Sequence, residues 1–166
     1  MSLVDQYKQL HQEGKFAGFS TLEHAEQIGN LVRETGSTSV LDYGCGKGLQ
    51  YSRHAIHEPW GITRLQLYDP AVPGFTEAPE AADGVICCDV MEHIPSEEVP
   101  VVLGQVIGLA RKFVFFVICT RASKKFLPDG RNCHLTIKPR EWWGNVIDSQ
   151  RGGSAVRIVT EFRDGL

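Results

Sequence analysis

One nonapeptide constrains the fold of this chain more than any other segment. It reads VLDYGCGKG over residues 40–48, an apolar run that ends in an acid and then in three glycines at alternate positions. This pattern predicts a buried parallel strand that turns sharply into a helix. Glycine is needed where the backbone adopts a positive φ or lies against a ligand. Because ligands of open α/β sheets bind at the carboxyl ends of strands, we expect a nucleoside-bearing cofactor at this turn.

Two other nucleotide-binding patterns do not fit the turn. A dinucleotide fingerprint would place its third glycine at position 49, which is Leu49, and a P-loop would place Ser or Thr after Lys47. Residues 42–48 instead resemble the first motif of class I S-adenosylmethionine-dependent methyltransferases, D-x-G-x-G-x-G, at every fixed position. The resemblance covers residues 38–119 and implies a Rossmann-like fold with S-adenosyl-L-methionine as cofactor.

The resemblance also implies roles for individual residues. Asp42 corresponds to the acid that orients the methionine end of the cofactor, and Gly44, Gly46 and Gly48 to the glycines that admit it. Asp69, 21 positions after Gly48, corresponds to the acid that binds the ribose hydroxyls, although an Asp before a Pro is also a common turn former. The other residues expected at the cofactor are Tyr43, Cys45, Cys88 and Asp89.

A second motif follows the strand predicted over residues 84–88. Methyl transfer to oxygen or nitrogen requires an aligned acceptor and the removal of a proton. Asp89-x-x-Glu92-His93 resembles the D/E-x-x-E-H segment of two metal-assisted O-methyltransferase groups, those of ubiquinone biosynthesis and those that methylate the 3′-terminal ribose of small RNAs. In the RNA group a downstream histidine completes the metal site, and His134 corresponds to it here.

Asp89, Glu92, His93 and His134 are therefore the candidate catalytic residues, and Glu92, His93 and His134 are the candidate ligands if the site holds Mg²⁺ or Mn²⁺. The alternative follows from methyltransferases that carry the same Glu-His pair without a metal. In that case His93 is a pocket residue or a general base.

Charge is unevenly distributed along the chain. The net charge is −3, which gives no general attraction to nucleic acid or to anionic membranes. Residues 119–140, however, contain six basic side chains against the single acid Asp129. Arg121, Lys124, Lys125 and Arg131 of this basic loop are expected to bind an anionic acceptor, the alternative being a solvated loop without a binding role.

Length and composition favour one domain over residues 1–166. With 166 residues and 42% hydrophobic content, the chain can bury one core, and it shows neither a secretory signal nor an apolar run long enough to span a membrane. The five cysteines include no C-x-x-C pair, so we expect free thiols and a cytoplasmic protein.

Periodicity predicts the order of the elements. Two amphipathic helices, over 3–13 and 21–34, precede strands at 38–43 and 65–68, with a helix over 47–57 whose amide-rich N-terminus would face the cofactor. Strands at 84–88, 112–119 and 155–162 and helices over 96–109 and from 139 complete the chain. Only thirteen residues, 71–83, separate the second and third strands, too few for a helical crossover. The fold class is thus a doubly wound, mostly parallel α/β sheet trimmed at one edge.

The expected parts are the N-terminal helices (1–36), a cofactor-binding core (37–119) and the acceptor loop, helix and last strand (120–166). The function expected from the resemblance is O- or N-methylation of a small, anionic acceptor. The alternatives are a metal-assisted RNA ribose 2′-O-methyltransferase, so that nucleic acid stays open as a partner, and a non-catalytic S-adenosylmethionine-binding accessory or sensor protein. The acceptor, and whether the protein forms a homodimer, cannot be read from this chain because fold-level resemblance does not specify them.

Overall fold

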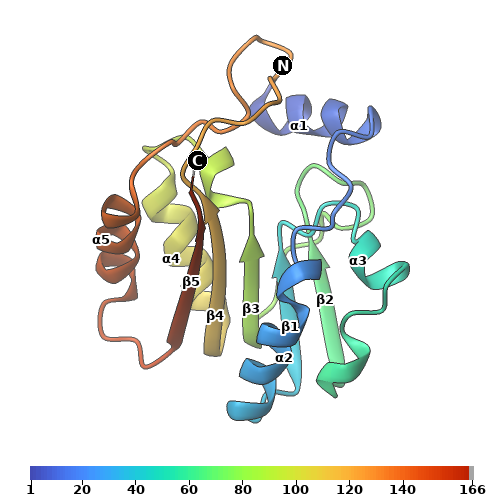
Figure 1. Cartoon of the computed structure of the whole chain (residues 1–166), viewed down its shortest axis with the longest axis vertical. Coiled ribbons are helices and arrows are strands. Elements are labelled where there is room, and N and C mark those ends of the chain that lie inside the picture. Colours follow the sequence, from blue (N-terminus) through green and yellow to red (C-terminus); the bar gives the residue numbers. More distant parts are fainter. Residues whose placement is uncertain (165–166) are drawn as a thin grey trace.

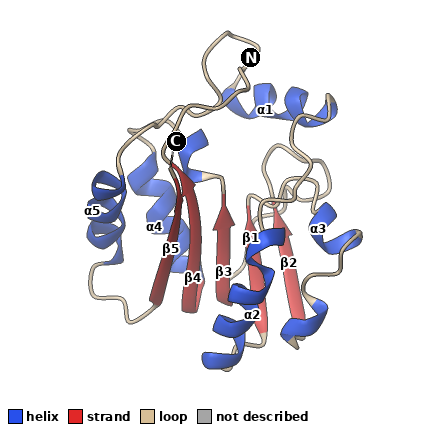
Figure 2. Ribbon diagram, in the orientation of Figure 1, coloured by secondary structure: helices blue, strands red, loops and turns tan. Residues whose placement is uncertain are grey.

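A computed structural model describes residues 1–164 and contains a five-stranded sheet in which every strand pairing is parallel. The strands are β1 (Ser39–Tyr43), β2 (Arg64–Tyr68), β3 (Ala82–Cys88), β4 (Ala110–Cys119) and β5 (Arg157–Arg163), in the spatial order β2-β1-β3-β4-β5. The helices are α1 (Leu3–Gln12), α2 (Ala25–Glu34), α3 (Leu49–Ser52), α4 (Val99–Leu109) and α5 (Arg140–Arg151) (Figures 1 and 2). The predicted α/β class and the parallel sheet are confirmed.

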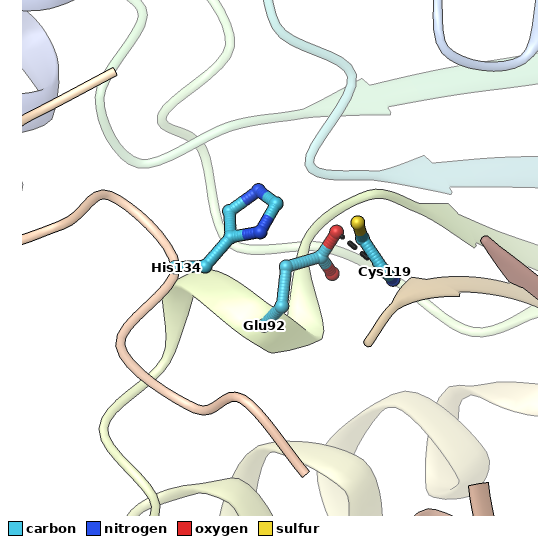
Figure 3. Close-up of side chains that lie close together, drawn as sticks. All are labelled: Glu92, Cys119 and His134. Carbon is cyan, nitrogen blue, oxygen red and sulfur yellow. Dashed lines mark hydrogen bonds between the residues drawn. The ribbon is translucent and has the colours of Figure 1, made fainter. Parts of the chain in front are cut away.

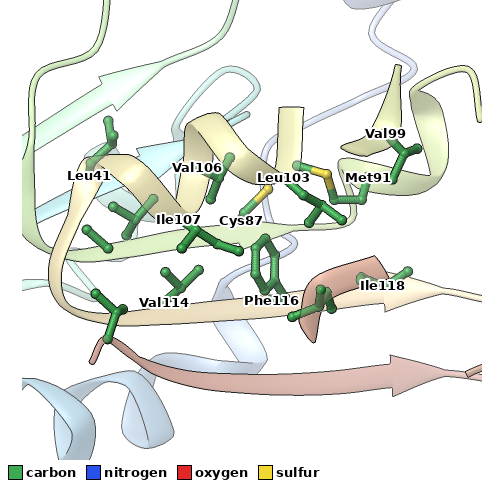
Figure 4. Close-up of a cluster of buried hydrophobic side chains, with 14 of the residues drawn as sticks. Leu41, Cys87, Met91, Val99, Leu103, Val106, Ile107, Val114, Phe116 and Ile118 are labelled. Carbon is green, nitrogen blue, oxygen red and sulfur yellow. The ribbon is translucent and has the colours of Figure 1, made fainter. Parts of the chain in front are cut away.

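Helices cover both faces of the sheet, which is why its central strands are apolar throughout. On one face, α4 and α5 bury Leu103, Ile107 and Trp143 against Phe116 and its neighbours (Figure 4). On the other face, the apolar side of α2 packs on Phe113 and Phe115 with other buried side chains. The continuous apolar run of β4 is therefore explained by burial on two sides.

The trimmed edge of the sheet is confirmed. After β2 the chain returns to β3 through residues 69–81, which contain no helix or strand. A loop over residues 69–75, closed by a hydrogen bond of 2.9 Å from the Asp69 amide to the Phe75 carbonyl, folds this short connection back. Strand β2 therefore remains the edge strand. From β1 the chain first adds β2 on one side and then adds β3 on the other side, so the strand order changes direction at β1. Open α/β sheets bind ligands at such a topological switch point.

The predicted helix over 47–57 is wrong in length. Only α3, four residues long, is helical, and the chain then turns through Ala55, whose φ is +48°. Tertiary packing explains the early end, because Trp60 docks on α2, donating from Nε1 to the Ala25 carbonyl at 2.9 Å, where Gly29 leaves room for its ring. So short a helix has no useful macrodipole, and the expected attraction of its N-terminus for a carboxylate does not apply.

Helix α1 lies over the carboxyl ends of the strands (Figure 1). It begins at Leu3 because Ser2 and Asp5 form a capping box, with each residue's side chain accepting from the other's backbone amide. A third apolar cluster, separate from the two sheet faces, joins Leu10 of α1 to Leu127 and Cys133 of the basic loop. The N-terminal helix and the basic loop thus close over the same edge of the sheet. Within residues 1–164, none of the helices combines the length and apolar character needed to cross a membrane.

Candidate active site

A cavity of about 990 Å³ opens along the carboxyl ends of the strands, beneath α1. Its walls come from α1, residues 16–23, the glycine turn after β1, residues 69–71 after β2, residues 88–95 after β3, residues 119–124 after β4, His134 and the end of β5. All five strand ends therefore contribute to one site, as expected for a ligand-binding edge of a parallel sheet. A volume of this size lies at the upper end of small-molecule sites, which span about 300–1,000 Å³.

The glycine turn borders the cavity through Gly44 and Gly46, whereas Gly48 lies outside its walls. All three glycines have positive φ, +85°, +57° and +61°, so the turn needs them for its backbone conformation. Gly46 is also required because another segment of the protein, rather than a ligand, lies close to it: a Cβ on Gly46 would lie 3.1 Å from the Gly18 Cα. The N-terminal segment therefore packs directly on the turn.

Asp42 lies beneath the cavity rather than in its wall. Its side chain is 1% exposed and accepts hydrogen bonds from the Tyr51 hydroxyl at 2.6 Å and from Gln50 Nε2 at 2.9 Å. Burial raises the pKa of this carboxyl to about 7. Gln50 does border the cavity and also binds Thr21, so Asp42 acts on the site indirectly, by fixing the residues between it and the N-terminal segment.

Asp69 lies in the cavity wall at the end of β2, where the sequence motif places it. One carboxylate oxygen accepts from the Gly46 amide and the other from the Ala71 amide, both at 2.9 Å. Asp69 therefore fastens the glycine turn to the end of the neighbouring strand. Because each carboxylate oxygen can accept about two hydrogen bonds, the side chain retains acceptor capacity for a ligand.

Three further residues expected at the cofactor border the cavity: Tyr43, Cys45 and Cys88. The ring of Tyr43 contacts that of Tyr68 in a tilted arrangement, with centroids 4.9 Å apart, and burial raises the pKa of the Tyr43 hydroxyl. Burial likewise raises the pKa of both thiols, above all that of Cys88. These side chains are therefore neutral and form an apolar part of the wall.

Asp89 borders the cavity in a left-handed conformation, with φ +54°. Its carboxylate accepts from Arg163 Nε at 2.9 Å, and Arg163 also pairs with Glu23. Arg163 was not predicted from the sequence. It could have been, because Arg163 is the last residue of β5 and the ends of parallel strands meet at one edge of the sheet. Pairing with a guanidinium makes Asp89 a charge partner and weakens its candidacy as a base.

Glu92 is fully buried at 0% exposure, yet it borders the cavity. One carboxylate oxygen accepts from the Cys119 backbone amide at 3.2 Å, and the other, Oε2, has no partner (Figure 3). Burial, together with nearby Asp89, raises the pKa of Glu92 to about 8. An unpartnered buried carboxylate oxygen beside a cavity is a strong indication of a ligand there.

The two histidines expected at the reaction centre lie together, with rings 4.9 Å apart and perpendicular. His93 Nδ1 lies 2.9 Å from the Cys133 carbonyl and His134 Nδ1 lies 2.6 Å from the Arg121 carbonyl, so each Nδ1 carries the proton. Each Nε2 therefore presents a lone pair. Burial, followed by the neighbouring His134, lowers the pKa of His93 to about 3, and burial lowers that of His134 as well.

The potential metal ligands differ from the predicted set. Ligand atoms of Glu92, Cys119 and His134 all lie within 4.8 Å of one another, whereas His93 is outside this group (Figure 3). Cys119 was missed because the sequence motif contains no cysteine. Its position could have been found from topology, since it is the last residue of β4 and parallel strands end at one edge.

The four basic residues expected to bind an acceptor divide into two pairs. Arg121 and Lys124 border the cavity, whereas Lys125 and Arg131 do not. Lys125 lies over the Phe16 ring, 4.1 Å from its centroid, and donates to the Lys15 carbonyl at 2.5 Å. Arg131 donates from Nε and Nη2 to a single oxygen of Asp129, Oδ2, at 3.0 and 2.8 Å. The latter two side chains therefore stabilise the loop.

Helix α1 supplies two cavity residues that sequence reasoning did not assign, Tyr7 and His11. Tyr7 donates to the Cys133 carbonyl at 2.8 Å and contacts the His93 ring edge-on, with centroids 5.4 Å apart. His11 is 8% exposed, burial lowers its pKa, and its Nδ1 has no partner. The spacing of four residues, which puts both on one face of a helix, was the available signal.

Comparison with known proteins adds no assignment, because no family model, curated protein or solved structure matches this chain.

Proposed function

We propose that the protein transfers the methyl group of S-adenosyl-L-methionine to an oxygen or nitrogen atom of a small acceptor. The observation that carries the proposal is the position of the D-x-G-x-G-x-G turn. It forms part of the wall of a large cavity at the switch point of a parallel sheet, tied by Asp69 to the end of the adjacent strand. A nucleoside cofactor is the ligand class that such an edge suits.

The cavity residues fit this cofactor in size and in chemistry. A volume of about 990 Å³ accommodates a nucleoside linked to an amino acid and leaves space for a small acceptor. Asp69 offers its remaining acceptor capacity to the ribose hydroxyls, and Pro70 and Ala71 form an apolar surface beside it for the base. Arg121 and Lys124 are the cations of the basic loop that reach the cavity wall.

The bound cofactor would supply an electrophilic methyl group, and the chain must supply alignment and take up a proton. His93 is the best-placed base, because it borders the cavity and its Nδ1–H is held by the Cys133 carbonyl, which leaves the Nε2 lone pair free. Burial lowers its pKa to about 3, so the imidazole is neutral but weakly basic in this structure. Asp89 is neutralised by Arg163, and Glu92 holds a proton below about pH 8. The fixed Nδ1–H bond also orients the imidazole ring of His93.

An anionic small molecule is the acceptor class that we favour. Arg121 and Lys124 border the cavity and are exposed, so they add positive charge without the cost of being buried. The other two expected cations are held within the loop, which reduces the predicted attraction to a local one.

The proposal is tested by transfer of an isotopically labelled methyl group to a panel of anionic metabolites, neutral metabolites and RNA. We expect label on an anionic metabolite, dependent on His93. Label on RNA would favour the ribose methyltransferase. Tight cofactor binding with no label transferred to any class of acceptor would favour a non-catalytic binding protein.

A further inference from the structure

Three side chains from separate segments converge at the inner wall of the cavity. Glu92 lies in the short helical turn Met91–His93, Cys119 ends β4, and His134 lies in the basic loop. One ligand atom from each lies within 4.8 Å of the other two, and all three residues border the cavity (Figure 3). We propose that Glu92, Cys119 and His134 form a zinc site whose fourth position opens into the cavity.

The unpartnered oxygen of Glu92 is the second observation behind this site. Its Oε1 is held by the Cys119 amide, so the orientation of the carboxylate is fixed, while Oε2 is buried and has no hydrogen-bond partner. A buried carboxylate in this state costs free energy unless a cation or a donor completes it. No hydrogen bond among the described residues uses this oxygen. A cation bound by the Glu92 carboxylate would supply a partner of opposite charge to the buried group.

His134 is prepared in the way that metal-binding histidines usually are. Its Nδ1–H donates to the Arg121 carbonyl at 2.6 Å, which fixes the tautomer and leaves Nε2 as the ligand atom. His93 has the same tautomer, with Nδ1–H directed at the Cys133 carbonyl, but it lies outside the triad. The geometry thus assigns one histidine to the metal and leaves the other free.

Ligand chemistry selects zinc over magnesium. Thiolate and imidazole are soft or borderline ligands, which Zn²⁺ accepts and Mg²⁺ does not favour. One thiolate and one carboxylate also neutralise a divalent cation, so the occupied site would carry no net charge where it is buried. Ligand atoms bound tetrahedrally to zinc are about 3.3–3.8 Å apart, so atoms now separated by up to 4.8 Å must approach one another by at most about 1.5 Å to close the site.

Three protein ligands leave one position for water or for a hydroxyl group of an acceptor, as in catalytic zinc sites. Zinc lowers the pKa of a bound water to about 7, and it would lower the pKa of a bound hydroxyl group in the same direction. This consequence for the acceptor rests on the proposed function, whereas zinc binding itself does not.

The test measures zinc on the purified full chain, without cofactor or acceptor. We expect about one zinc per chain after removal of free metal, no displacement by excess Mg²⁺, and a thiolate-to-metal charge-transfer band when Co²⁺ replaces zinc. Because zinc is measured alone, a failure here leaves the methyl-transfer proposal standing, and a failure of methyl transfer leaves the site standing.

Variants locate the ligands. Cys119→Ser and His134→Gln should each weaken zinc binding by at least about 100-fold, since the loss of an outer-shell partner alone costs about 10–100-fold. Cys133→Ser is the matched control, because Cys133 is also a buried cysteine but packs against Leu10 and Leu127, outside the cavity wall. Circular dichroism checks that each variant is folded. Substoichiometric zinc in the wild type, no cobalt–thiolate band, or equal losses in Cys133→Ser and Cys119→Ser would overturn the proposal.

Discussion

Replacing Asp69 with Ala tests both roles that the structure gives this carboxylate. The side chain holds the Gly46 and Ala71 amides, each at 2.9 Å, and it faces the cavity. Hydrogen bonds to a charged group contribute about 1.5–3 kcal/mol each, and water entering from the cavity partly replaces them. We therefore expect the free energy of unfolding to fall by about 2–4 kcal/mol.

The same variant should lose two ribose hydrogen bonds, which would weaken binding of S-adenosylhomocysteine by about 1.5–3 kcal/mol, or about 10- to 150-fold. Urea unfolding measures the first effect, and calorimetric titration of folded protein measures the second.

Asp83→Ala is the matched control for this experiment. Asp83 is also buried and accepts from a backbone amide, that of Thr38 at 2.9 Å, but it lies at the start of β3, outside the cavity wall. It should lose stability and keep its affinity for S-adenosylhomocysteine. If Asp69→Ala binds this ligand as tightly as Asp83→Ala does, then Asp69 is only a turn anchor and the assignment of the ribose site is refuted.

Other substitutions test neighbouring parts of the site. Gly46→Val should displace the segment 16–20 and increase tryptic cleavage after the adjacent Lys15, whereas Gly36→Val, with the same φ of +57° but nothing within 4 Å, should not. Equal cleavage of the two variants would refute the packing argument. In protein stripped of metal, Glu92 retains a proton in the folded state between about pH 4.5 and 8, so the free energy of unfolding falls as pH rises through this range. Glu92→Gln should therefore reduce that decline by a few kcal/mol in urea titrations, and an unchanged decline would contradict the burial argument. His93→Ala should lower methyl-transfer turnover by about 10²–10⁴ without altering cofactor affinity, and a turnover close to that of wild type would exclude it as the base.

Strands were predicted well because burial on two faces leaves a direct record in the sequence. The apolar run of β4 and the short connection after β2 determined the parallel sheet and its trimmed edge. The helix after the glycine turn could not be predicted from local pattern, because its early end depends on the docking of Trp60 on α2. A contact between residues 35 positions apart in sequence thus outweighs the helix propensity of residues 53–57.

The residues that border the cavity could be predicted where they follow strands, but not where their position depends on the fold of loops. Gly44, Asp69 and Asp89 come directly after strand ends, and all three border the cavity. Cys119 and Arg163 obey the same rule, but the motif that drew attention to the other strands does not include them. The sequence could not show that Lys125 and Arg131 lie outside the cavity wall, because this depends on their partners in the fold. Lys125 binds the Lys15 carbonyl after α1, and Arg131 pairs with Asp129 within the basic loop.

The central claim is that the cavity at the carboxyl edge of the sheet binds S-adenosyl-L-methionine, and a crystal structure of the protein grown with excess S-adenosylhomocysteine tests it most directly. We expect density for the ligand beside Gly44 and Gly46, with the ribose hydroxyls donating to Asp69 and the sulfur directed towards His93. Ligand density at any other position, or a cavity that stays free of ligand at saturating concentration, would contradict it.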